Sequence, residues 1–280
     1  MRIRTFDDVE AFHHRVAHLI QTDPVIYSVM ATNLARARRR SQEDALWFTI
    51  DDGPTVIAAA MWTPPYPVHL SFGEPELASA LARHLLSQDM RPPGVAGVSP
   101  AVSSFARFWR EEVGDTTETV MDQRLFTVDE VIESETVPGT PRRSRPSDLD
   151  LASGWGAAFQ VEAMGTEPAR KDDFTDRLAD GALWLWEDED RRVSMTFASK
   201  VSSGVSRISY VYTPPEHRRR GYAGALVAAV SRYILSAGSR PVLFTDLANP
   251  TSNHIYQELG YRPVADFSHV VFTASGASSD

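Results

Sequence analysis

Three consecutive arginines, Arg218 to Arg220, stand directly before two glycines and their small neighbours, Gly221 to Gly224. An apolar, β-branched run over residues 208–212 precedes them and predicts a strand. Pro214 must end that strand, because proline cannot donate to a strand ladder. After the glycines, apolar residues recur at helical spacing as far as Gly238, which favours a helix stop. The predicted order is therefore a strand, a basic turn with glycines, and a helix.

This order of elements suits a site for phosphate groups. The first turn of a helix presents unpaired backbone N–H groups and about half a positive charge. Glycine lets a phosphate approach the backbone without an intervening Cβ atom, and arginine adds charge-assisted hydrogen bonds. The turn therefore predicts a site for a cofactor that carries a di- or triphosphate. It is neither a P-loop nor the dinucleotide motif G-x-G-x-x-G. A solvated basic turn at a helix start is the structural alternative.

The same turn resembles the signature of a known superfamily. Arg218-x-x-Gly221-x-Ala223 is similar to the R/Q-x-x-G-x-G/A acyl-CoA signature of the GNAT acyltransferases, which lies between the fourth strand and the following helix. The segment 249–261 then resembles the family pattern N-x-x-S-N-x-x-Y-x-x-x-G-F/Y, in the expected order and at the expected distance. The resemblance extends over residues 180–273, roughly the last third of the chain.

The resemblance implies a role for each matching residue. Acetyl-CoA would be the acyl donor, its pantetheine arm would lie between two splayed strands, and no metal would take part. The backbone N–H of Val211 would polarise the thioester carbonyl, and Asn253 would contact the cofactor arm. Tyr256 would protonate the leaving thiolate, since a phenol is protonated at neutral pH. The implied cofactor-binding residues are Val211, Tyr212, Thr213, Arg218, Arg219, Arg220, Gly221, Tyr222, Ala223, Gly224 and Asn253.

The sequence leaves the general base open. The attacking amine must lose a proton, although direct attack on the thioester needs no covalent enzyme intermediate. The predicted strand 205–212 carries no carboxylate. Asp246, at the end of its strand, and Glu162, at the end of a helix, are the candidates, and a structural role is the alternative for each. A water relay is equally compatible, and His217 is not favoured because it lies in the phosphate turn.

Composition and charge restrict the classes of partner. The net charge of −9, with a pI near 5.4, argues against a protein that binds nucleic acid or an anionic membrane. The absence of cysteine excludes a disulfide and a thiolate nucleophile. The N-terminus lacks the apolar core of a signal peptide, so a cytoplasmic protein is expected. His14 and His18 stand four residues apart, but no third ligand accompanies them, and no metal site is predicted.

The order of elements predicts an α+β fold in two lobes, each with a mostly antiparallel mixed sheet flanked by helices. In the first half, helices are expected over residues 7–20, 24–38, 74–88 and 101–113, and strands over 45–50, 55–62, 67–72, 94–98 and 116–128. In the second half, a strand or linker is expected near 142–146, helices over 148–163, 168–180, 222–238 and 252–259, and strands over 182–187, 192–199, 205–212, 241–246 and 261–272. The repeated order supports a duplication, and a chance match of short fragments is the alternative.

The two halves differ at the phosphate turn. The first half has Gly73-Glu74-Pro75 at the corresponding place, with no arginine, and Glu74 would repel a phosphate. We therefore expect residues 1–133 to form a degenerate GNAT-like domain with a structural or acceptor-shaping role. Residues 140–276 are expected to form the catalytic domain that binds acetyl-CoA.

The resemblance predicts an N-acetyltransferase that moves acetyl from acetyl-CoA to a primary amine in a ternary complex. Because tandem members of the family include enzymes that act on small amines, a small-molecule acceptor is favoured. A monomer or homodimer without nucleic-acid or membrane partners is expected. Acetylation of a protein lysine or N-terminus is one alternative, and a non-catalytic acyl-CoA sensor is another. An open groove beside the thiol would favour a protein acceptor, whereas a closed cavity would favour a small amine.

Overall fold

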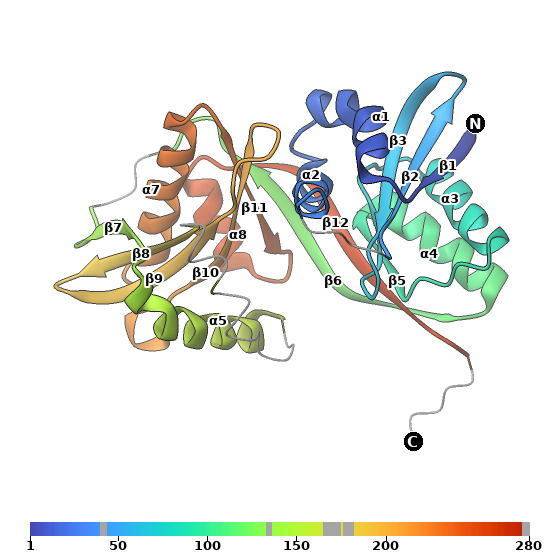
Figure 1. The fold of residues 1–280 in the computed structure, drawn as a ribbon. Coiled ribbons are helices and arrows are strands. Elements are labelled where there is room, and N and C mark those ends of the chain that lie inside the picture. The colour runs from blue at the N-terminus through green and yellow to red at the C-terminus, as the bar shows by residue number, and fades with distance from the viewer. Residues whose placement is uncertain (40–43, 133–135, 165–174, 176–181, 276–280) are drawn as a thin grey trace. The chain divides into compact units, whose positions relative to one another are not determined.

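The computed structural model describes residues 1–39, 44–132, 136–164, 175 and 182–275 (Figure 1). The chain divides into two compact units. The first contains Met1–Leu125, Asp246–Ala248 and Val264–Asp280, and the second contains Phe126–Thr245 and Asn249–Pro263. Each unit is a mixed β-sheet with helices on both faces, which confirms the predicted fold class.

The sheet of the first unit has the strand order β1-β2-β3-β4-β5-β12-β6. Neighbouring strands are antiparallel from β1 to β4, β4 and β5 are parallel, and β5 and β12 are antiparallel. The strands are β1 (Arg2–Phe6), β2 (Leu46–Asp52), β3 (Thr55–Trp62), β4 (Val68–Leu70), β5 (Gly94–Val98), β6 (Thr116–Thr127) and β12 (Arg262–Thr273). The helices are α1 (Val9–Thr22), α2 (Ser28–Ala37), α3 (Pro75–Ser87) and α4 (Ser99–Val113).

Both faces of this sheet are buried, because successive side chains of a strand point to opposite faces. In β2, Trp47 packs with the residues of α1 and α2, whereas Phe48 packs with those of α3 and α4. On the second face, Trp109 of α4 stacks on Phe272 of β12 with ring centroids 5.4 Å apart. The last strand of the chain therefore contributes to the core of the first unit.

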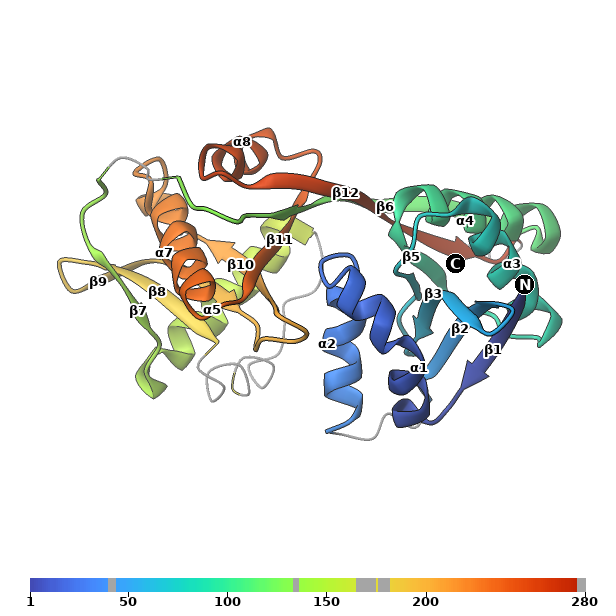
Figure 2. The same ribbon diagram turned by 90° about the horizontal axis from the view of Figure 1, so that it is seen from above.

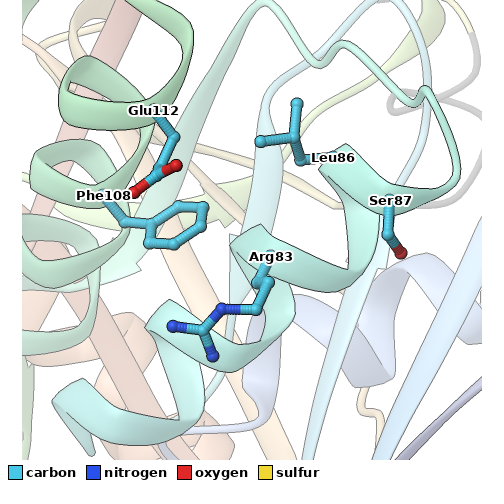
Figure 3. A pocket seen from close by; sticks show the side chains of 5 residues that line it. All are labelled: Arg83, Leu86, Ser87, Phe108 and Glu112. Carbon is cyan, nitrogen blue, oxygen red and sulfur yellow. The ribbon is translucent and has the colours of Figure 1, made fainter.

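A pocket of about 320 Å³ lies in the first unit between α3 and α4 (Figure 3). The guanidinium carbon of Arg83 lies 5.2 Å from the centroid of the Phe108 ring, and this pair forms one wall. The lining residues are Arg83, Leu86, Ser87, Phe108 and Glu112. None of the site residues predicted from the sequence lines this pocket.

In the second unit, the strand order from the end of β6 is β6-β11-β10-β9-β8-β7. Only β10 and β11 are parallel among the pairs described from β7 to β11. Figure 1 shows α5 and α7 on opposite sides of β8 and β9, and Figure 2 gives the view turned by 90°. The elements are β7 (Thr140–Arg143), α5 (Leu149–Met164), β8 (Leu183–Asp188), β9 (Arg191–Ala198), β10 (Val205–Tyr212), α7 (Tyr222–Ser236), β11 (Arg240–Asp246) and α8 (Pro250–Glu258).

Two features differ from the predicted elements, and one predicted helix cannot be compared. Strand β1 was not expected, and it forms because it pairs with β2 and because Arg4 donates to the buried Asp51 at 2.8 Å. Helix α2 begins at Ser28 rather than at residue 24, since the N–H of Ile26 donates to Asp23 at 3.1 Å and closes a separate turn. The helix expected over 168–180 lies outside the described residues, apart from residue 175.

The position of β12 in the sheet bears on where the two predicted domains begin and end. Val270 of β12 pairs with Val95 of β5, and Asp266 accepts two hydrogen bonds from Arg124 of β6, at 2.7 and 3.0 Å. The described residues 264–275 thus pack within the first unit, although they follow the whole second half in sequence. The division into domains 1–133 and 140–276 stays a prediction about the family's domain limits.

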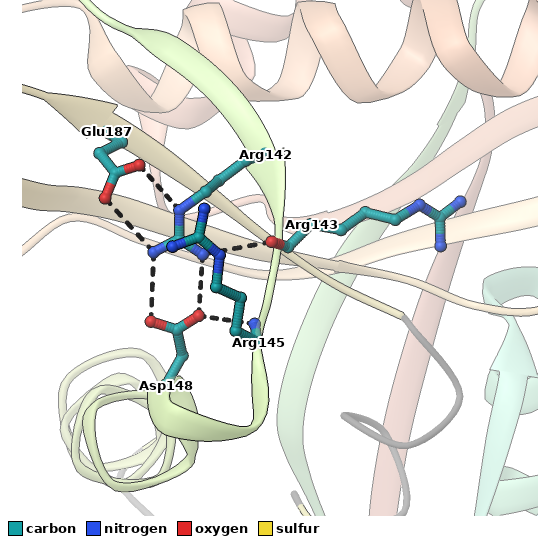
Figure 4. A network of polar contacts seen from close by, with 5 residues as sticks. All are labelled: Arg142, Arg143, Arg145, Asp148 and Glu187. Atoms are coloured by element: carbon teal, nitrogen blue, oxygen red, sulfur yellow. Dashed lines mark hydrogen bonds and ion pairs between the residues drawn. The ribbon is translucent and has the colours of Figure 1, made fainter. Parts of the chain in front are cut away.

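Arg142 of β7 links β8 to the start of α5 (Figure 4). Its side chain donates to Asp148 at 2.8 Å and to Glu187 at 2.8 Å, and Asp148 also accepts the backbone N–H of Arg145 at 2.7 Å. Burial alone would raise the pKa of Asp148, but the bonds from Arg142 and Arg145 outweigh burial and lower it. The hydrogen bond from Arg142 also lowers the pKa of Glu187.

We expect Arg142→Met to lower the free energy of unfolding by about 2 kcal/mol at pH 7, because Asp148 would stay buried without its charged partner. Both carboxyl groups have lowered pKa values in the folded chain, so their contribution is present above the unfolded pKa values, about 4, and is lost as the pH falls through the folded ones. The difference between the two proteins should therefore shrink below about pH 4. Urea unfolding across pH checks this, and a difference that grows at low pH would contradict it.

Candidate functional site

The predicted phosphate turn joins β10 to α7. A single 3₁₀ turn, Pro215–His217, follows β10, and Gly221 then begins α7 as its N-cap with φ of +79°. The first helical N–H to form a backbone bond is that of Ala225, which donates to Gly221 at 3.0 Å. The N–H groups of residues 222–224 therefore lack intrahelical partners. Within the described part of the chain, no side chain caps this start and no acid lies in its first turn.

Two glycines keep this helix start open. The positive φ of Gly221 is one that L side chains rarely adopt, and a Cβ atom there would lie 2.9 Å from Val137 Cγ2. A Cβ atom on Gly224 would lie 3.5 Å from Ile255 Cγ2 of α8, so α7 and α8 lie side by side here. Arg219 and Arg220 are exposed directly before the glycines. The turn thus combines free N–H groups with positive charge.

Strand β10 separates from β11 before its C-terminal end. Their register runs from Val205 opposite Arg240 to Ile208 opposite Leu243, and it includes no later residue of β10 among those described. On the other edge, Tyr210 and Val211 together oppose a single residue of β9, which is a β-bulge. Tyr210 has a φ of +52°. The predicted contacts Val211, Tyr212 and Thr213 therefore lie at a strand end that is unpaired toward β11.

Four predicted site residues meet at this strand end. Arg218 donates through Nε to the carbonyl of Thr213 at 2.8 Å and through Nη2 to Glu162 at 2.6 Å. The hydroxyl of Tyr212 donates to the other carboxylate oxygen of Glu162 at 3.4 Å. The hydrogen bond to Glu162 raises the pKa of Arg218. The side chain of Arg218 thus contacts protein groups on the side of α5.

Asn253 and Tyr256 lie on α8. The side-chain amide of Asn253 donates to the carbonyl of Asn249 at 2.8 Å. Tyr256 is 8% exposed and belongs to the same buried cluster as Ile208 and Tyr222, with Val211 packed against it. Burial raises the pKa of Tyr256 to about 12. Its phenol therefore carries its proton throughout the physiological pH range.

Asp246, the other predicted base, caps the turn after β11. Its carboxylate accepts the backbone N–H of Ala248 at 2.8 Å, and these residues group with the first unit. This contact supports the structural role that the sequence analysis gave as the alternative for Asp246. It leaves Glu162 as the predicted base that contacts the phosphate turn directly.

The first unit differs at the equivalent turn. The N–H of Gly73 donates to the carboxylate of Glu74 at 3.0 Å, so an acidic side chain lies at the turn that leads into α3. Strands β4 and β5 stay paired as far as Leu70 opposite Gly97. Gly97 has φ of +139°, and a Cβ atom there would lie 2.1 Å from the carbonyl oxygen of Leu70. The two strands are thus held close where β10 and β11 separate.

Sequence reasoning missed the bulge in β10 and the Arg218–Glu162 pair. A tyrosine at positive φ has no signal in residue type, because asparagine, aspartate and glycine are the usual occupants. Within the described residues, no three histidine or acidic side chains are grouped to hold a metal ion. No described helix is both long and apolar enough to cross a membrane.

Comparisons with known proteins concern the fold. Residues 190–270 match the family model described as FR47-like protein. None of the curated proteins matches the sequence. Among solved structures, a GCN5-related N-acetyltransferase from Sphaerobacter thermophilus is similar at 17% identity and TM-score 0.64, with 99% of this chain and 98% of that chain covered.

Two further structures match nearly the whole chain. A GNAT-family acetyltransferase from Colwellia psychrerythraea has 9% identity and TM-score 0.61, over 98% of this chain and 100% of that one. A tandem GNAT protein from the clavulanic acid biosynthesis pathway has 10% identity and TM-score 0.54, over 99% of this chain and 100% of that one. At these identities the likeness establishes the fold. The resemblance to the GNAT superfamily is therefore confirmed, by the fold of the whole chain and by the FR47-like segment at residues 190–270.

Proposed function

We propose that the chain is an N-acetyltransferase that moves acetyl from acetyl-CoA to the primary amine of a small molecule, with its site in the second unit. The observation that carries this proposal is the uncapped start of α7, which follows a strand end that has separated from its neighbour. A helix start of this kind favours a bound pyrophosphate. The parted strand end offers unpaired backbone groups to the amides of a pantetheine arm.

The residues present fit this ligand. The backbone N–H groups of residues 219–224 would bind the pyrophosphate, and the exposed Arg219 and Arg220 would add positive charge. Val211, Tyr212 and Thr213 would pair with the arm, and Asn253 would contact it from α8. When bound, acetyl-CoA supplies an acyl group already activated as a thioester.

Two groups of the chain would assist the transfer itself. The N–H of Val211 would stabilise negative charge on the carbonyl oxygen, as an oxyanion donor does. Tyr256 would give its proton to the departing sulfur, and its burial keeps that proton in place until the thiolate forms. A direct attack by the amine needs no nucleophile on the protein. Its proton would pass to Asp246, to Glu162 or to a water molecule.

The test is amine-dependent release of CoA. Acetyl-CoA is mixed with the purified chain and a panel of polyamines, amino sugars, amino acids and lysine peptides, and free CoA is measured with a thiol reagent. The chain has no cysteine, so the protein gives no background in this assay. Release with a small amine supports the proposal. Release with lysine peptides alone would identify a protein acetyltransferase, and tight binding without turnover would identify a sensor.

We expect Tyr256→Phe to lower kcat by about 100-fold, because the leaving thiolate loses its proton donor. The affinity for acetyl-CoA should stay within a factor of about 3, since the ring remains in the buried cluster. Tyr261→Phe is the matched control: its hydroxyl bonds Ser231 in the same core at 2.6 Å, and its loss should leave kcat unchanged. Equal losses in both variants would assign Tyr256 a packing role.

A further inference from the structure

We propose that Arg218 and Glu162 are a positioning pair that fixes the end of α5 against the acyl-CoA turn, rather than a phosphate ligand and a general base. This inference rests on the proposed function, which places the donor at that turn. It assigns the first arginine of the signature to the contact between α5 and the turn, and not to the cofactor. It also removes Glu162 from the candidates for the general base.

The guanidinium of Arg218 is already bound to groups of the protein itself. Nε donates to the carbonyl of Thr213 at 2.8 Å, Nη2 donates to Glu162 at 2.6 Å, and the group lies over the Tyr212 ring, 5.8 Å from its centroid. These partners fix the orientation of the planar guanidinium group. Arg219 and Arg220 are both exposed, and Arg220 interacts with Tyr222. Neither is paired with a carboxylate among the described residues, so both remain available to a phosphate.

The contacts of Glu162 likewise commit its carboxylate. One oxygen accepts from Arg218 and the other from the Tyr212 hydroxyl, so both oxygens are hydrogen-bonded. Burial, with a further contribution from the charge of Glu162, raises the pKa of Tyr212, so that hydroxyl remains a donor. These two bonds use one lone pair on each oxygen and hold the carboxylate toward Arg218 and Tyr212.

The same end of α5 also packs against the bulged part of β10. Gln160 donates to the Tyr210 hydroxyl at 3.2 Å, and the rings of Phe159 and Tyr210 lie 5.0 Å apart. One turn earlier, the Trp155 ring lies 6.2 Å from that of Tyr212. The Glu162–Arg218 pair is thus the last of several contacts that set α5 on the strand from which the acetyl group would be presented. It joins this surface to the phosphate turn.

A specific kinetic pattern follows. Arg218→Ala leaves the backbone N–H groups of residues 222–224 and the two exposed arginines unchanged, but releases the end of α5. We expect KM for the amine to rise about 10-fold, because small misplacements of a reacting group are costly. The dissociation constant of CoA should change less than about 3-fold, since the pair is itself half exposed. Glu162→Ala should show the same pattern.

Glu162→Gln separates positioning from proton transfer, because an amide oxygen can still accept from Arg218. If Glu162 is a positioning residue, kcat should fall less than about 10-fold. If it is the general base, kcat should fall about 100-fold or more, and the acidic limb of the pH profile should disappear. Binding of CoA is measured by calorimetry, and KM with the best amine of the panel. Arg232→Ala and Glu189→Gln, both exposed in the same unit, are the matched controls and should change neither quantity.

Two results would overturn the inference. One is a larger loss of CoA affinity than of amine KM in Arg218→Ala, which would make Arg218 a phosphate ligand. The other is the loss of the acidic limb in Glu162→Gln, which would make Glu162 the base. If no amine is acetylated, the proposed function fails by itself. A double-mutant cycle of unfolding free energies for Arg218→Ala and Glu162→Ala still tests the pair, and additive effects would refute it.

Discussion

Gly221→Asp is expected to weaken the binding of acetyl-CoA by about 1,000-fold, because it places a carboxylate against the pyrophosphate. Two unit charges 4 Å apart near a protein surface repel by about 4 kcal/mol, which corresponds to that factor. The new side chain would also stand at a φ of +79°, at the open start of α7. Calorimetric titration with acetyl-CoA measures the effect.

Gly238→Asp is the matched control for this prediction. Gly238 follows the other end of the same helix, has φ of +72°, and a Cβ atom there would meet open space. The control therefore adds the same charge and a similar backbone strain away from the predicted phosphate site. It should bind acetyl-CoA like the parent protein. Equal losses of affinity in the two variants would show that strain in α7, and not the charge, is the cause.

Val270→Asp is expected to unfold the first unit while the second unit remains folded. Val270 is 6% exposed, pairs with Val95 and packs in the cluster beneath α3 and α4. A carboxylate buried there without a partner costs several kcal/mol, roughly 3 or more, which is a large part of the stability of one unit. Hydrogen exchange resolved by peptide should show loss of protection in α3 and α4, with α7 unchanged.

Val264→Asp tests the same strand at an exposed place. Val264 is 39% exposed, so its carboxylate would stay in water and should change the stability by less than about 0.5 kcal/mol. If β12 instead served the core of the second unit, Val270→Asp would remove protection from α7 and weaken acetyl-CoA binding. That outcome would contradict the place of β12 described above.

The elements that local chemistry specifies were predictable. The turn at Gly221 could be located because proline ends β10, glycine permits the left-handed start, and helical spacing begins directly afterwards. The hairpin of β2 and β3 was predictable for the same reason, since Gly53 lies between two apolar runs. In each case a residue type restricts the backbone by itself.

Features that depend on partners distant in sequence were not predictable. Strand β1 has charged residues within it and next to it in sequence. Among the described residues, the buried Asp51 of β2 is the partner of Arg4. The alternation of β12 indicates which of its side chains are buried, but not which strand lies beside it. Glu162 and Arg218 are 56 residues apart, and neither residue type identifies the other as its partner.

The place of β12 between β5 and β6 has a consequence for synthesis. The helices of the first unit and all its other strands leave the ribosome early, since a chain emerges from its N-terminus. Strand β12, which pairs with the second edge of β5, follows all the other described elements in sequence and is made after them. Until then β5 is an open edge, with backbone groups free to pair with another chain. The unit that is translated first is therefore the one that completes its sheet last.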